Sequence, residues 1–216
     1  MPIRFGKPSV LSAKRFALNT PCQETPFEPM RITLPTILTL FRIALIPVIV
    51  VTFYLPFKGA NIVAATVFAL GAITDWLDGW IARKYNLTSA FGAFLDPVAD
   101  KLTVTITLFL LVQADPSILM AVVCSIIVGR EITISALREW MAEIGERKHV
   151  RVALLGKIKT IVQMVAIVIL LARLPKVGLP MYQFGQTLLI AAAVLTIWSG
   201  AVYIRAAWPI LRGREQ

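Results

Sequence analysis

The chain has 216 residues, of which 57% are hydrophobic and only 16% are charged. A water-soluble protein of this length has too little interior to bury so much apolar surface, so the composition excludes an ordinary soluble domain and predicts a membrane protein. The net charge is +10, but the basic residues are scattered between apolar runs, which favours an anionic membrane surface over nucleic acid as the partner.

Residues 1–30 are basic, rich in proline and poor in apolar runs, a composition typical of a flexible tail. Met30 stands directly before the first apolar segment, so a native start at Met30, which would exclude residues 1–29, stays open as an alternative. Residues 31–216 are expected to form one membrane domain.

Six apolar segments with short connecting loops follow the tail. At about 1.5 Å per residue, each segment is long enough to cross a hydrocarbon core of about 30 Å as a helix. We therefore predict an all-α polytopic membrane protein with six transmembrane helices. The predicted helices span residues 34–56, 61–83, 90–112, 117–140, 152–173 and 182–206.

The lysine and arginine residues outside the apolar cores predict the orientation of these helices. With the N-terminus inside, thirteen of them fall on the cytoplasmic side, whereas the opposite side has only Lys58, Arg173 and Lys176. Because cytoplasmic loops of membrane proteins carry an excess of basic residues, both termini are predicted to face the cytoplasm.

Charged residues inside the apolar segments converge on one layer of this topology. The second segment carries Asp75 and Asp78 near its inner end, and the third segment begins on the inner side with Asp96 and Asp100. A charge at membrane depth is costly unless it is paired, hydrated or bound to metal. Other charges in the same cytoplasmic third of the membrane are Arg42, Lys101, Arg130, Glu131, Arg138, Glu139, Lys157 and Lys159.

The spacing of the four aspartates indicates a metal site. Asp75 and Asp78 are three residues apart and Asp96 and Asp100 four apart, so each pair shares one face of its helix. Such an all-oxygen cluster suits a hard cation such as Mg, Mn or Ca. The only histidine, His149, is in a predicted loop, which excludes a histidine-ligated zinc site.

Basic residues outnumber acidic ones around these carboxylates, and that surplus suits phosphate groups. Several other interpretations remain open at this point. The aspartates could form ion pairs that hold helices together, such as Asp75 with Arg130, and Arg42 and Lys101 could reach out to the membrane interface. Arg138 and Glu139 could belong to a solvated helix end. A cation transporter is a further alternative, although it predicts carboxylates near the midplane rather than at one side.

The run from Asp75 to Asp100 matches every fixed position of the CDP-alcohol phosphotransferase signature, so the chain resembles that family. These positions are Asp75, Asp78, Gly79, Ala82, Arg83, Gly92, Asp96 and Asp100. Other stretches resemble one branch of it, the bacterial phosphatidylglycerophosphate synthases, namely Leu34–Ile43, Phe91–Leu102, Gly129–Ala142 and Gly156–Val162. Thr33 stands where the family often has asparagine, and the long tail is also unlike the family.

The resemblance implies a homodimer in the bacterial cytoplasmic membrane, with six membrane helices per chain and a site facing the cytoplasm. It implies that the four aspartates hold two divalent cations, Mg or Mn, and that Asp100 is also the general base. The pocket for the cytidine diphosphate of a CDP-lipid would be lined by Gly79, Ala82, Arg83 and Gly92.

The implied reaction joins CDP-diacylglycerol and glycerol 3-phosphate to give phosphatidylglycerophosphate and CMP. The stretch Gly129–Ala142 favours glycerol 3-phosphate, while inositol phosphate, serine and phosphatidylglycerol remain alternative acceptors. Because an anionic acceptor needs fixed cations beside the metal site, we predict that Arg130, Arg138 and Lys157 bind its phosphate.

Overall fold

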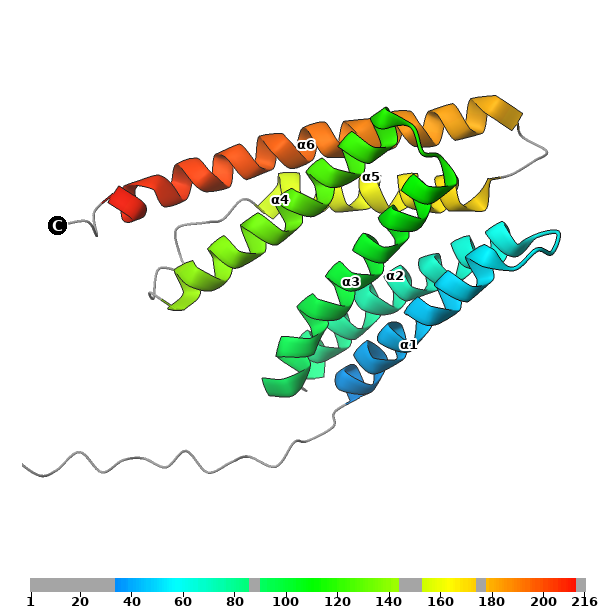
Figure 1. The fold of residues 1–216 in the computed structure, drawn as a ribbon. Coiled ribbons are helices and arrows are strands. Elements are labelled where there is room, and N and C mark those ends of the chain that lie inside the picture. The colour runs from blue at the N-terminus through cyan, green and yellow to red at the C-terminus, as the bar shows by residue number, and fades with distance from the viewer. Residues whose placement is uncertain (1–33, 86–89, 144–152, 174–177, 213–216) are drawn as a thin grey trace, which may run out of the picture. The chain divides into compact units, whose positions relative to one another are not determined.

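The computed structural model describes residues 34–85, 90–143, 153–173 and 178–212, and the predicted tail lies outside them. The described chain is helical, with short turns and no strand, as the sequence predicted. Five helices agree with the predicted segments to within about three residues at each end, while the last one extends further at both ends. The helices are α1 Leu34–Tyr54, α2 Ala60–Tyr85, α3 Ala90–Ala114, α4 Ile118–Glu143, α5 Ala153–Ala172 and α6 Gly178–Arg212 (Figure 1).

Four of the described helices are long and apolar enough to cross a membrane. Their candidate spans are Thr36–Tyr54, Ala60–Ile81, Ile118–Ala142 and Pro180–Arg205, and α5 adds a shorter apolar stretch, Ile158–Ala172. These helices confirm the all-α polytopic membrane fold. Crossing by all six helices and cytoplasmic termini stay predictions.

Contacts between neighbouring helices join all six into a closed ring. The order around it is α1, α2, α5, α6, α4 and α3, with α3 returning to α1, and α3 also touches α5 across it. Helix α1 thus packs against both α2 and α3, the two helices that carry the aspartates. This order brings residues 30 or more positions apart in the sequence to one site.

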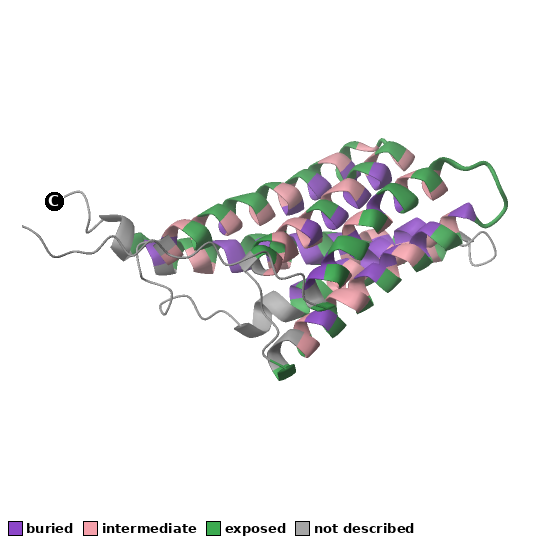
Figure 2. Ribbon diagram, turned by 90° about the horizontal axis from the view of Figure 1, so that it is seen from below, coloured by how far each residue is buried: buried purple, intermediate pink, exposed green. Residues whose placement is uncertain are grey.

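Apolar side chains fill the interior of the ring and also cover its outside. Phe68, Leu108, Ile127, Leu170 and Leu189 are almost fully buried and belong to one core cluster. In Figure 2 buried and exposed positions alternate along the helices. Large apolar side chains are exposed on every helix, which lipid solvates at no cost. Examples are Leu34, Ile73, Phe94, Ile118, Ile161 and Trp198.

A polar network attaches the turn between α3 and α4 to α6, about 15 residues beyond Asp100 along the chain. The Asp115 carboxylate accepts hydrogen bonds from Tyr182 Oη at 2.6 Å and from Gln186 Nε2 at 3.0 Å, both on α6. It also accepts one from the Ser117 amide at 3.3 Å. The hydrogen bond from Tyr182 is the main reason why the pKa of Asp115 is lowered. This turn is therefore held to α6 by hydrogen bonds as well as by apolar packing.

Gly185 marks a close approach between α5 and α6. A Cβ atom at this position would lie 2.9 Å from Ile169 Cγ2 and 3.0 Å from Leu170 Cγ. Because Leu170 is fully buried in the core, it cannot move away without disturbing other contacts.

We predict that Gly185→Ala destabilises the protein by about 1–3 kcal/mol, because the added methyl group overpacks this contact. Gly129→Ala on α4 is the matched control, since a Cβ there meets no atom within 4 Å. The control should be neutral or stabilising by up to ~1 kcal/mol, the usual gain from alanine inside a helix. Thermal unfolding of both variants in detergent measures the difference, and equal unfolding midpoints would contradict the packing argument.

Candidate active site

Arg42 is the one charged residue of α1, and its side chain is buried between α1, α2 and α3. Only 2% of the residue is exposed. The burial follows from the ring order, because α1 packs against both aspartate-bearing helices. A buried guanidinium needs paired carboxylates to offset the loss of hydration. Arg42 therefore does not reach the membrane interface, which was one interpretation of the sequence.

The guanidinium of Arg42 contacts carboxylates from two helices. Its Nη1 lies 2.6 Å from Asp75 Oδ1 and 3.4 Å from Asp96 Oδ1, and its Nη2 pairs with Asp78 Oδ2. The ion partner of Asp75 is thus Arg42, whereas Arg130 lies 3.6 Å from Glu131. A single side chain from α1 thus links Asp75 and Asp78 of α2 to Asp96 of α3.

Asp75, Asp78 and Asp96 form a group that could hold a metal ion. Each offers an oxygen, and the three oxygens lie within 4.8 Å of one another. One guanidinium faces three carboxylates, so the group carries an excess of negative charge when all three are ionised. Asp78 Oδ1 is buried and has no hydrogen-bond partner among the described residues. Carboxylate oxygens, charge excess and an unpartnered ligand atom all fit a hard divalent cation.

Asp100, one turn after Asp96 on α3, lies beside this group rather than within it. It lines a small cavity together with Arg42, Asp75 and Met164. It also lines a second cavity of about 50 Å³ between α3, α4 and α5, here called the interhelical cavity. Asp100 therefore lies between the aspartate group and the interhelical cavity.

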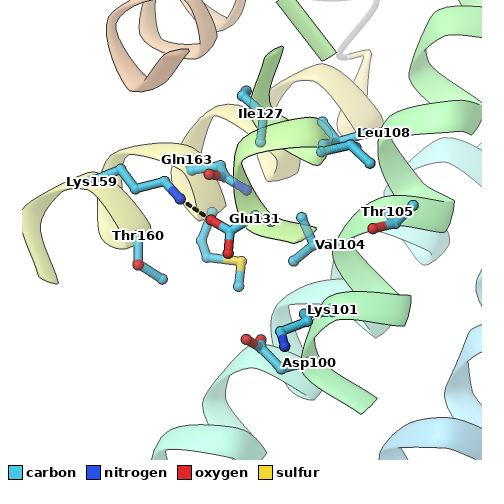
Figure 3. A pocket seen from close by; sticks show the side chains of 12 residues that line it. Asp100, Lys101, Val104, Thr105, Leu108, Ile127, Glu131, Lys159, Thr160 and Gln163 are labelled. Atoms are coloured by element: carbon cyan, nitrogen blue, oxygen red, sulfur yellow. Dashed lines mark hydrogen bonds and ion pairs between the residues drawn. The ribbon is translucent and has the colours of Figure 1, made fainter. Parts of the chain in front are cut away.

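The interhelical cavity combines polar and apolar walls. The Lys159 ammonium donates to the Glu131 carboxylate, and Figure 3 shows this pair on the same side of the cavity as Gln163 and Thr160. Lys159 is only 3% exposed, so Glu131 compensates a buried charge. The cavity is lined by Asp100, Lys101, Thr105, Glu131, Lys159, Thr160 and Gln163, and by the apolar Val104, Leu108, Ile127, Val128 and Met164.

The other predicted site residues lie on the same helices, at varying distances along them. Gly79 directly follows Asp78 on α2, and Gly92 lies one turn before Asp96 on α3. Arg130 Nη2 donates to Ser199 Oγ on α6 at 2.7 Å, and Arg138 is exposed on α4. Three side chains lie outside the described ones, namely Ala82, Arg83 and Lys157.

The structure adds residues to which the sequence assigned no role. Arg42 could have been recognised, because it is the lone charge in an otherwise uncharged segment. Lys159 and Gln163 are four residues apart and so share one face of α5, a spacing that the sequence also displays. Glu131 gives no comparable signal, since its partner Lys159 is 28 residues away.

We predict that Arg42→Gln destabilises the metal-free protein by about 3–5 kcal/mol, because it leaves the buried carboxylate of Asp78 without its cation. Added Mg or Mn should then raise the unfolding temperature of the variant more than that of the wild type, since the metal replaces the lost charge. Arg205→Gln, an exposed arginine on α6, is the control. Equal stabilisation of variant and wild type by the metal would show that Arg42 and the metal do not share these carboxylates.

Comparisons with known proteins agree with this geometry. The family model for CDP-alcohol phosphatidyltransferase matches residues 32–198. A protein of Salmonella choleraesuis is 49% identical over 82% of this chain and 96% of its own length. A protein of Yersinia pestis is 49% identical over 83% and 97%, and one of Pectobacterium atrosepticum 48% identical over 82% and 96%. All three are named CDP-diacylglycerol–glycerol-3-phosphate 3-phosphatidyltransferase. With most of its length matched by both comparisons, the chain belongs to the CDP-alcohol phosphatidyltransferase family.

Proposed function

We propose that this protein transfers the phosphatidyl group of CDP-diacylglycerol to glycerol 3-phosphate, giving phosphatidylglycerophosphate and CMP. The observation that carries the proposal is the position of Asp100 between a three-aspartate group and a polar cavity. Such an arrangement provides one side for a metal-bound diphosphate and another for an acceptor alcohol. The names of the relatives support the same pair of substrates.

The aspartate side is proposed to bind the CDP-lipid. Asp75, Asp78, Asp96 and Asp100 would hold two divalent cations, Mg or Mn. When bound, these cations offset the negative charge of the diphosphate as the bond to CMP breaks. Gly79, Ala82, Arg83 and Gly92 would line the pocket for the cytidine diphosphate.

The cavity side is proposed to bind the acceptor. Asp100 would take the proton from the 1-hydroxyl of glycerol 3-phosphate, and the resulting oxygen would attack the phosphorus bonded to diacylglycerol. The bond from that phosphorus to the CMP oxygen breaks, and CMP leaves with the electron pair. Arg130, Arg138 and Lys157 are proposed to bind the acceptor phosphate, and Lys159 adds a buried cation beside Asp100.

The membrane setting of the reaction belongs to the same proposal. The multi-pass fold and the bacterial relatives support a bacterial inner membrane, with the active site facing the cytoplasm, where CDP-lipid headgroup and glycerol 3-phosphate would meet. A homodimer is proposed from the family resemblance.

We predict that purified protein with CDP-diacylglycerol and Mg or Mn moves label from radiolabelled glycerol 3-phosphate into lipid. Asp100→Asn should lower the initial rate at least ~100-fold, because the amide cannot accept the hydroxyl proton. Asp115→Asn is the matched control, since it makes the same chemical change away from the site. Asp115 directly follows the C-terminal end of α3, where its carboxylate accepts a hydrogen bond from Tyr182 of α6. It should retain transfer.

Other acceptors serve as competing outcomes of the same assay. Label from serine, inositol phosphate or phosphatidylglycerol instead of glycerol 3-phosphate would retain the chemistry and overturn the acceptor. Folded protein that transfers to no acceptor with metal present would overturn the enzyme proposal. Uptake of a divalent cation into vesicles that contain the protein would then test the transporter alternative.

A further inference from the structure

Gln163 is a buried amide with an unsatisfied oxygen on the wall of the interhelical cavity. It is 4% exposed, and its Oε1 has no hydrogen-bond partner among the described residues. It lies one turn after Lys159 on α5 and lines the cavity together with Asp100 (Figure 3). An unpartnered amide oxygen inside a membrane protein costs free energy, so a ligand hydroxyl that reaches it would be bound favourably.

The size of the interhelical cavity suits a small ligand beside Gln163. Its volume of about 50 Å³ has room for about four water-sized groups. That is the scale of a three-carbon polyol. The polar residues on its wall also favour a hydrophilic ligand over a lipid tail.

We propose that Gln163 Oε1 accepts a hydrogen bond from the middle hydroxyl of the acceptor and so selects a glycerol-type acceptor. This inference rests on the proposed function. Asp100 takes the attacking hydroxyl, and Lys101 and Lys159, the two cations on the cavity wall, attract the phosphate at the opposite end of the molecule. The middle hydroxyl of the acceptor then still needs a partner, and Gln163 Oε1 offers the cavity a buried acceptor atom that has no partner among the described residues.

The proposal is tested with two acceptors that differ in this hydroxyl alone. Glycerol 3-phosphate carries it, whereas 3-hydroxypropyl phosphate has the same attacking hydroxyl and phosphate and lacks it. Wild-type protein should prefer glycerol 3-phosphate in kcat/KM by about tenfold or more, since the analogue leaves Gln163 unsatisfied.

Gln163→Met removes the hydrogen-bonding group while keeping a side chain of similar length. We predict that it lowers kcat/KM for glycerol 3-phosphate by about the same factor and leaves kcat/KM for the analogue unchanged, so that the preference disappears. Gln183→Met, at an exposed position of α6, is the matched control and should retain the wild-type preference. If Gln163→Met does not fold, Gln163→Asn withdraws the amide by one methylene and serves the same comparison.

Three outcomes would overturn the proposal. An equal loss with both acceptors would show that Gln163 supports the helix packing only. A wild-type protein that does not discriminate between the acceptors would show that the middle hydroxyl is not bound. A wild-type protein that transfers to neither acceptor would overturn the proposed function itself, which separates that failure from a failure of the role of Gln163.

Discussion

The guanidinium of Arg42 is surrounded by Asp75, Asp78 and Asp96, and the arrangement of the first three helices depends on this contact. Neither Arg42 nor Asp78 could be buried alone at membrane depth, because each would lose its hydration without compensation. Helix α1 must therefore pack against both α2 and α3. The charge excess that remains explains why the same group suits a divalent cation.

Asp100 connects two different environments. On one side lie Arg42 and Asp75, a charged environment suited to metal and diphosphate. On the other lie the Glu131–Lys159 pair and Gln163, a smaller polar cavity with apolar walls. A reaction between a membrane-bound lipid and a small hydrophilic alcohol needs two such environments that meet at one proton acceptor. The helix order places α3 between them, because α3 contacts α1 on one side and α4 and α5 on the other.

Much of the fold followed from hydropathy, because a helix that crosses lipid must satisfy its own backbone and carry a long apolar run. The aspartate pairs were equally readable, since residues three or four apart share a face of a helix. The lone charge of Arg42 in the first segment was visible in the sequence, but the partners of its side chain were not. Its partners lie 33 to 54 residues away, and the sequence was equally compatible with a side chain that reaches the membrane interface. The pairing of Glu131 with Lys159 could not be predicted either, because the two residues are 28 positions apart on different helices.

The sequence by itself thus determined six helices, the metal-type spacing of the aspartates and the family to which the chain belongs, because each of these is encoded over a helical turn or a short motif. Only the tertiary structure decided which charges meet. It placed Asp100 beside the group of the other three aspartates, paired Arg42 with that group, and brought Lys159 and Gln163 to the cavity beside Asp100. The physical reason is that pairing between helices depends on their order around the ring, and helical periodicity carries no information about that order.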